Sequence, residues 1–128
     1  MKIKELENIG IFFKKSTCFS YWLERLLLIC HEYSTQNLEY CSDIIAYYME
    51  QYYKAVGEIH PYINSDGVKY IVNELLRPDS LLIDDLTSGD YAELINQHFK
   101  THYKNCDYSI FHFLSGEIRN LRFYEVLY

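Results

Sequence analysis

Glycine is scarce in this sequence, and the motifs that depend on it are absent. The chain has 5 glycines among its 128 residues, and neither a P-loop nor a Gly-x-Gly-x-x-Gly pattern is present. The Gly-x-Ser-x-Gly motif of many hydrolases is missing as well. The sequence therefore gives no sign of a nucleotide cofactor or a catalytic nucleophile. We expect a protein that binds without catalysis and without a cofactor.

Paired cysteines and long apolar runs are also lacking. The chain has 4 cysteines and no Cys-x-x-Cys pattern. The apolar run at residues 26–30 is far too short to cross a bilayer. The alternating charges of residues 1–7 do not resemble a secretory leader. These features predict a cytoplasmic protein with free thiols and no membrane association.

Positive charge is in deficit along the whole chain. Lys and Arg number 12 against 18 Asp and Glu, which gives a net charge of -6, and neither half of the chain is basic. Binding to a nucleic-acid backbone depends on Lys and Arg. The balance therefore disfavours a nucleic-acid partner, whereas a basic protein would be attracted by it.

Aromatic residues, by contrast, are abundant, with 14 Tyr and 7 Phe. Tyrosine is enriched on protein-binding surfaces, and a domain of this size cannot easily bury so many rings. We expect some of them to be exposed at a binding surface. A general drift of composition toward Tyr, Ile, Asn and Lys explains the same count equally well.

Apolar residues recur at helical spacing along most of the chain. They predict helices over residues 2–14, 18–33, 38–56, 68–77 and 89–103. The two clearest apolar stripes are Phe19, Trp22, Leu26, Ile29 and Tyr33, and then Leu38, Cys41, Ile45, Tyr48 and Tyr52. Because a short polar link joins these two helices, we expect them to pack against each other as an antiparallel pair.

The last segment changes in character. Residues 108–113 are rich in aromatic and β-branched side chains, which favours a strand. Ser115 and Gly116 form a turn signal, and residues 118–128 fit either a returning strand or a helix. We favour the strand. The predicted fold is mainly α (α+β): a bundle of about five helices with a small C-terminal β-hairpin, in a single domain over residues 1–128.

One aromatic row on the helix at 38–56 lies outside its main stripe. Another helix covers this row, or a partner does. An acidic segment from Asp79 to Glu93 would supply a charged rim for an aromatic anchor. The predicted partner-binding residues are Tyr40, Ile44, Tyr47, Asp79, Asp84, Asp85, Asp90 and Glu93. We therefore predict a protein that binds and modulates a protein partner, as an inhibitor, immunity protein or antitoxin does.

A nucleic-acid-binding regulator is the first alternative. Helices at 68–77 and 89–103 followed by a hairpin have the element order of a winged helix. The basic residues that would line its helix and wing are Lys100, Lys104, Arg119 and Arg122.

A ribonuclease or toxin is the second alternative. Arg25 and His31 form an Arg-x5-His pair that resembles the short motif of the HEPN ribonucleases and toxins. The resemblance implies a helical bundle whose Arg and His meet at a dimer cleft and act on RNA phosphate. Leu26 departs from the family, which usually has a polar residue after the Arg.

A weak metal-site candidate lies near the end of the chain. Zinc takes imidazole and thiolate ligands in a tetrahedron. The residues with suitable spacing are His98, His102, Cys106 and His112. Histidines at the edge of an apolar face and a buried thiol explain the same spacing, and we favour that interpretation over a metal site.

Overall fold

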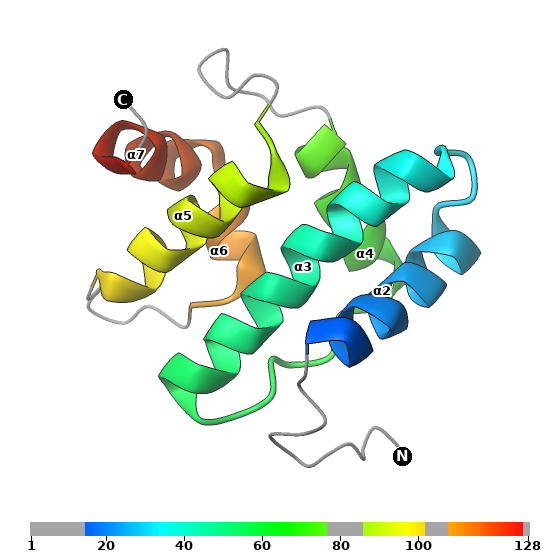
Figure 1. Ribbon diagram of the computed structural model, residues 1–128, viewed down its shortest axis with the longest axis horizontal. Helices are drawn as coiled ribbons and strands as arrows, with labels where there is room; N and C mark the ends of the chain where they lie inside the picture. Colours follow the sequence, from blue (N-terminus) through cyan, green and yellow to red (C-terminus); the bar gives the residue numbers. More distant parts are fainter. Residues whose placement is uncertain (1–14, 77–85, 102–107, 127–128) are drawn as a thin grey trace.

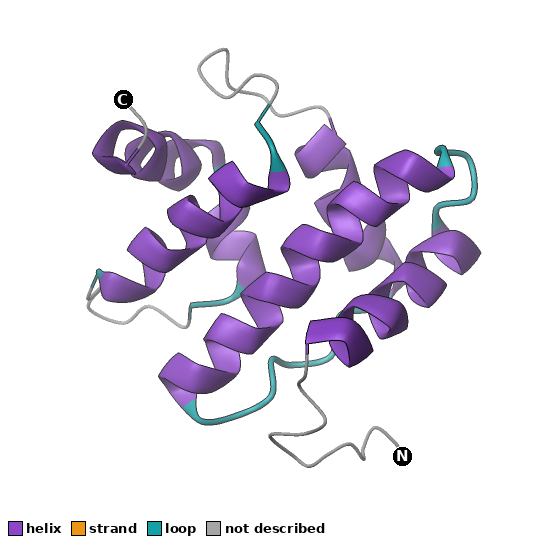
Figure 2. Cartoon of the chain, viewed as in Figure 1, coloured by secondary structure: helices purple, strands orange, loops and turns teal. Residues whose placement is uncertain are grey.

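The computed structural model describes residues 15–76, 86–101 and 108–126, and these residues form helices joined by loops without any strand (Figure 2). The helices are α2 (Lys15–Ile29), α3 (Thr35–Val56), α4 (Ser65–Leu76), α5 (Ser88–Lys100), α6 (Ile110–Leu114) and α7 (Gly116–Val126). The helix predicted over residues 2–14 lies outside the described residues. None of the described helices combines the length and apolar character needed to cross a membrane.

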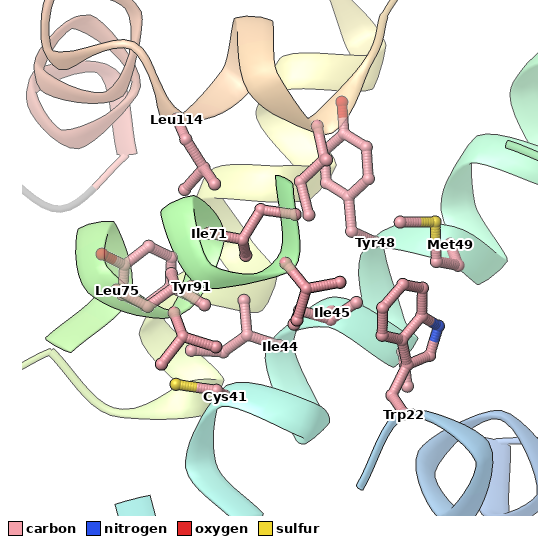
Figure 3. Close-up of a cluster of buried hydrophobic side chains, with 14 of the residues drawn as sticks. Trp22, Cys41, Ile44, Ile45, Tyr48, Met49, Ile71, Leu75, Tyr91 and Leu114 are labelled. Carbon is pink, nitrogen blue, oxygen red and sulfur yellow. The ribbon is translucent and has the colours of Figure 1, made fainter. Parts of the chain in front are cut away.

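Helix α3 is the central element of the bundle. It packs against α2 on one side and α5 on the other, α4 and α6 lie behind it, and α7 packs against α5 at the edge (Figure 1). The two predicted apolar stripes meet, since Leu26 on α2 and Leu38 and Ile45 on α3 are all fully buried. Trp22 and Ile45 point into the same apolar interior (Figure 3). The predicted pairing of these two helices is confirmed.

Capping residues set several of the helix ends. The Ser34 side chain accepts a hydrogen bond from the Asn37 N–H, 3.2 Å away, at the start of α3. Gly57 ends α3 with φ 85°, a left-handed conformation that favours glycine. Thr87 and Asp90 form a reciprocal capping box at the start of α5, with N···O distances of 3.0 and 3.1 Å. The sequence predicted the end of α3 at Val56 and the start of α5 within one residue, whereas α3 begins three residues before the predicted start at Leu38.

The predicted C-terminal β-hairpin was wrong. Its two segments are helices α6 and α7, and the Ser109 side chain caps α6 by accepting from the His112 N–H. The buried residues of α6 are Ile110, Phe113 and Leu114, a spacing of three and four that one face of a helix provides and a strand does not. Burial of this face therefore outweighs the β-propensity of the aromatic side chains.

Candidate functional site

Three exposed aromatic rings, one each from a loop, α4 and α6, form the best candidate for a functional surface. Tyr62 in the loop 57–64 is 79% exposed, Tyr70 on α4 is 45% exposed and Phe111 on α6 is 37% exposed. The Tyr70 and Phe111 ring centroids lie 5.9 Å apart. We call these three rings the aromatic surface. Tyr62 is linked to this pair through its neighbour Ile63, which lies with Phe111 against Gly67. Neighbouring exposed apolar groups mark binding sites more often than scattered ones do.

A glycine allows the three elements to meet. A Cβ atom at Gly67, in the first turn of α4, would lie 2.7 Å from Ile63 Cγ2 and 3.1 Å from Phe111 Cζ. Any larger side chain would force the Ile63 and Phe111 side chains to shift. The Gly67 N–H also donates to Asn64 Oδ1, at 2.8 Å, which fixes the loop to the start of the helix.

Arg25 on α2 holds the loop from the other side. Its Nη2 atom donates to the Ile63 carbonyl at 2.8 Å. Its Cζ atom lies 5.1 Å from the ring centroid of Trp22 and 5.2 Å from that of Tyr62. Cation–π contacts of this kind contribute about 0.5–1 kcal/mol at exposed sites. Tyr62 is therefore exposed but already positioned.

Helix α6 is fixed to α3 and to the loop. The Tyr48 hydroxyl donates to the carbonyl oxygens of Tyr108 and Ser109, at 2.6 and 3.2 Å. The Ile110 N–H donates to His60 Nε2 at 3.1 Å. Phe111 follows Ile110 directly, so these bonds also set the place of its ring.

The segments that carry the aromatic surface are more acidic than basic. Glu58 in the loop and Asp66 on α4 are exposed, as is one base on α4, Lys69. On α2, Glu24 is exposed and precedes Arg25, whose guanidinium keeps its positive charge while it contacts the Ile63 carbonyl and two rings. The negative charge of these segments follows that of the whole chain.

A second notable feature is a buried charged cluster where α7 meets α4 and α5. Arg119 on α7 is 0% exposed, and its Nη2 atom lies 3.0 Å from Glu74 Oε1 on α4. Its Nη1 atom donates to the Glu74 carbonyl at 3.3 Å. Burial raises the pKa of the neighbouring Tyr91 phenol, although the Arg119 charge beside it acts in the opposite direction. This cluster fixes α7 to the bundle.

The weak metal candidates are brought together only in part. His98 and His112 lie with ring centroids 5.5 Å apart, whereas His102 and Cys106 lie outside the described residues. Burial, then the charges of Arg122 and His112, lowers the pKa of His98 to about 3, so its ring is neutral at pH 7. Within the described ranges, no three His, Cys, Asp or Glu side chains gather to hold a metal ion.

The buried cysteines have little nucleophilic character. Cys18, Cys30 and Cys41 are free and buried. Burial raises the pKa of Cys18 and of Cys41 to about 12. Because the thiolate is the reactive form, these thiols do not act as nucleophiles near pH 7.

Helix α5 packs against the row of Tyr40, Ile44 and Tyr47 on α3. Ile44 is 2% exposed. The Tyr40 hydroxyl donates to the Leu86 carbonyl at 2.6 Å, and its ring packs edge-on to Tyr91. The Tyr47 hydroxyl donates to Asn96 Oδ1 at 2.5 Å. Contacts with α5 and with Leu86 before it therefore account for most of this row, while Tyr40 and Tyr47 stay half-buried.

The predicted acidic rim is described only at its end. Asp79, Asp84 and Asp85 lie outside the described residues. The Asp90 side chain caps α5 by accepting from the Thr87 N–H, and Glu93 is exposed on the same helix.

The structure describes most of the residues predicted for the two alternative functions. Arg119 and Arg122 are fully buried, and the hairpin that would form a wing is replaced by helices. Lys100 is exposed, whereas Lys104 lies outside the described residues. His31 lies exposed in the turn after α2, while the Arg25 guanidinium is directed to Ile63 in the loop 57–64.

Sequence reasoning missed the aromatic surface altogether. The available signal was Tyr62 itself, a large ring among the polar and turn-forming residues 57–67. Tyr70 and Phe111 gave no such signal, because their exposure depends on how α4 and α6 turn in the bundle.

No protein-family model matches the chain, and neither a curated protein nor a solved structure matches it. The assignment of function therefore rests on the residues of the chain itself.

Proposed function

We propose that the chain binds a basic protein through the aromatic surface, in the manner of an inhibitor, an immunity protein or an antitoxin. The observation that carries this proposal is Tyr62, which is 79% exposed and yet held in place by Arg25. Tyrosine is among the residues that most often supply large shares of binding energy at protein interfaces.

The fixed position of Tyr62 supports this role. Ordering a side chain on binding costs about 0.5–1.5 kcal/mol. Arg25 reduces that cost for Tyr62 in advance, because it links the loop backbone at Ile63 to the ring.

The charge of the surrounding segments selects the class of partner. Glu58 and Asp66 are exposed on the loop and on α4, against one exposed base, Lys69. The net charge of -6 acts in the same direction at longer range. A basic protein surface with an apolar centre would complement both features, and its binding would weaken as salt rises.

Site-specific photocrosslinking tests the proposal. A benzoylphenylalanine replaces Tyr62 in one variant and Tyr124 in a control variant, because Tyr124 on α7 is also exposed at 47% and lies outside the aromatic surface. Irradiation of cells that express each variant should give a discrete protein adduct at position 62 and none at position 124. The purified adduct partner should be basic. The same adduct at both positions, or a nucleic-acid adduct, would contradict the proposal.

A further inference from the structure

His60 connects the loop 57–64 to α6 through a bond that depends on its protonation. Its Nε2 atom accepts from the Ile110 N–H at 3.1 Å, and its Nδ1 atom lies 2.9 Å from the Pro61 carbonyl oxygen. An amide N–H only donates, so Nε2 must present a lone pair to it. The remaining proton therefore sits on Nδ1, where it donates to the Pro61 oxygen.

The imidazolium form does not fit this arrangement. A second proton on Nε2 would place two donors against each other, the imidazolium N–H and the Ile110 N–H. The bond would be lost, and the amide would need another acceptor. Neutral imidazole is thus the form that holds the loop and α6 together.

We propose that His60 is a pH-sensitive latch that fixes the loop 57–64 to α6 while neutral and releases it when protonated. Histidine ordinarily titrates near pH 6.5, inside the range that cells and their compartments cover. Because the latched state requires the neutral ring, the latch is closed at neutral pH and opens as the pH falls.

The surroundings of the ring support a local switch. From α3, the rings of Tyr52 and Tyr48 face the imidazole, with centroids 4.8 and 6.4 Å away. From α6 it faces the Ile110 amide, and from its own loop the Pro61 carbonyl. Glu58, the charged residue nearest to it along the loop, is exposed. Opening breaks the bond to α6 while the packing of the ring against α3 persists.

The latch regulates the aromatic surface, and this consequence rests on the proposed function. Tyr62 lies two residues after His60, and Phe111 is one residue after Ile110. Closing the latch therefore fixes two of the three exposed rings relative to each other. When the latch opens, the loop that carries Tyr62 is no longer held to α6, which carries Phe111. Binding of the partner should therefore weaken in acid.

Amide hydrogen exchange followed by NMR tests the latch without any partner. The probe is the Ile110 amide, and the control is the Gly57 amide, which donates to the Tyr53 carbonyl at the other end of the loop. Between pH 7.5 and pH 5.5, the protection factor of Ile110 should fall roughly tenfold relative to Gly57, since one hydrogen bond is lost.

Two variants separate titration from general acid effects. His60→Gln supplies an acceptor that does not titrate, so Ile110 should stay protected at both pH values. His60→Phe keeps a ring but has no acceptor, so Ile110 should be unprotected at both. An equal fall in wild type and His60→Gln, or full protection in His60→Phe, would overturn the latch.

A binding arm distinguishes the latch from the proposed function. The affinity for the purified crosslinked protein should fall between pH 7.5 and pH 5.5 in wild type and stay constant in His60→Gln. If Ile110 responds as predicted while Tyr62→Ala binds like wild type, the latch stands and the proposed function fails. If Tyr62→Ala weakens binding but wild type and His60→Gln show the same dependence of affinity on pH, the regulatory role is overturned.

Discussion

The interface between α2 and α3 buries apolar side chains, whereas the interface that holds α7 buries charged ones. The first is apolar, with Trp22, Leu26 and Ile45 buried in one interior. The second buries Arg119 and Arg122 of α7 instead, with Glu74 of α4 facing Arg119. Apolar contacts tolerate many arrangements because they have no direction, whereas a buried guanidinium needs its partners at defined places. The bundle thus has an apolar half around α2 and α3 and a charged half around α7, where the buried guanidinium groups need partners at defined positions.

Breaking the charged interface should have the largest effect. In Glu74→Leu, Arg119 stays buried without its carboxylate, so we expect a loss of about 3–5 kcal/mol in the free energy of unfolding. The double variant Glu74→Leu with Arg119→Met replaces the pair by apolar groups and should recover most of that loss. Urea denaturation measures both. A single variant as stable as wild type would show that the pair is not a requirement of the α7 interface.

The apolar interface should respond to a cavity rather than to a missing partner. Leu26→Ala deletes fully buried methyl groups and should cost about 2–5 kcal/mol. The control is Leu28→Ala on the same helix, where the side chain is 81% exposed and the change should stay within about 0.5 kcal/mol. The same urea titrations compare them. Equal effects at both positions would contradict the assignment of the inner face of α2.

Acid should also destabilise the charged half. The pKa of His98 is about 3 in the folded chain against 6.5 for an ordinary histidine, so below pH 6.5 the unfolded chain takes up a proton that the folded chain does not. His98 should therefore lower the stability by about 1.4 kcal/mol per pH unit in that window. His98→Phe should flatten the profile of unfolding free energy against pH between 6.5 and 4. An unchanged slope would refute this role.

Removing a helix cap should have the smallest effect on stability, because only one hydrogen bond is lost. The cap chosen is that of α5, a helix that packs against both α3 and α7. Thr87→Ala removes the hydroxyl that accepts from the Asp90 N–H, and the expected cost is about 1 kcal/mol. Thr87→Ser keeps the hydroxyl and should behave like wild type in thermal unfolding. If the serine variant loses as much as the alanine variant, the cap is not the cause.

The contrast between the halves also explains what could be predicted from sequence. Apolar periodicity predicted α2 and α3 and their pairing, because Trp22, Leu26 and Ile45 are both apolar and buried. The same reasoning failed at α7, where the buried positions are Arg119 and Arg122. A basic side chain in a sequence is expected at the surface. The segment therefore shows no apolar inner face of a helix, and the hairpin predicted from its aromatic and β-branched residues is wrong.

The exposed aromatic residues were harder to predict from the sequence than the helices were. The row of Tyr40, Ile44 and Tyr47 is set by its own helix, but its cover comes from α5, which is far away in sequence. Ile63, the residue after Tyr62, and Phe111 meet at Gly67, which admits both the loop and α6, and no local pattern encodes this tertiary contact. Which aromatic face stays exposed depends on such contacts.

The most direct test of the binding surface uses the partner protein identified by crosslinking at position 62. Calorimetry at fixed salt and pH 7.5 measures the affinity of this partner for wild type, Tyr62→Ala and Tyr124→Ala. Tyr62→Ala should bind at least about tenfold more weakly than wild type, as expected for an aromatic anchor. Tyr124→Ala should bind like wild type. Equal affinities for all three proteins, or an equal loss in both variants, would contradict the assignment of binding to the aromatic surface.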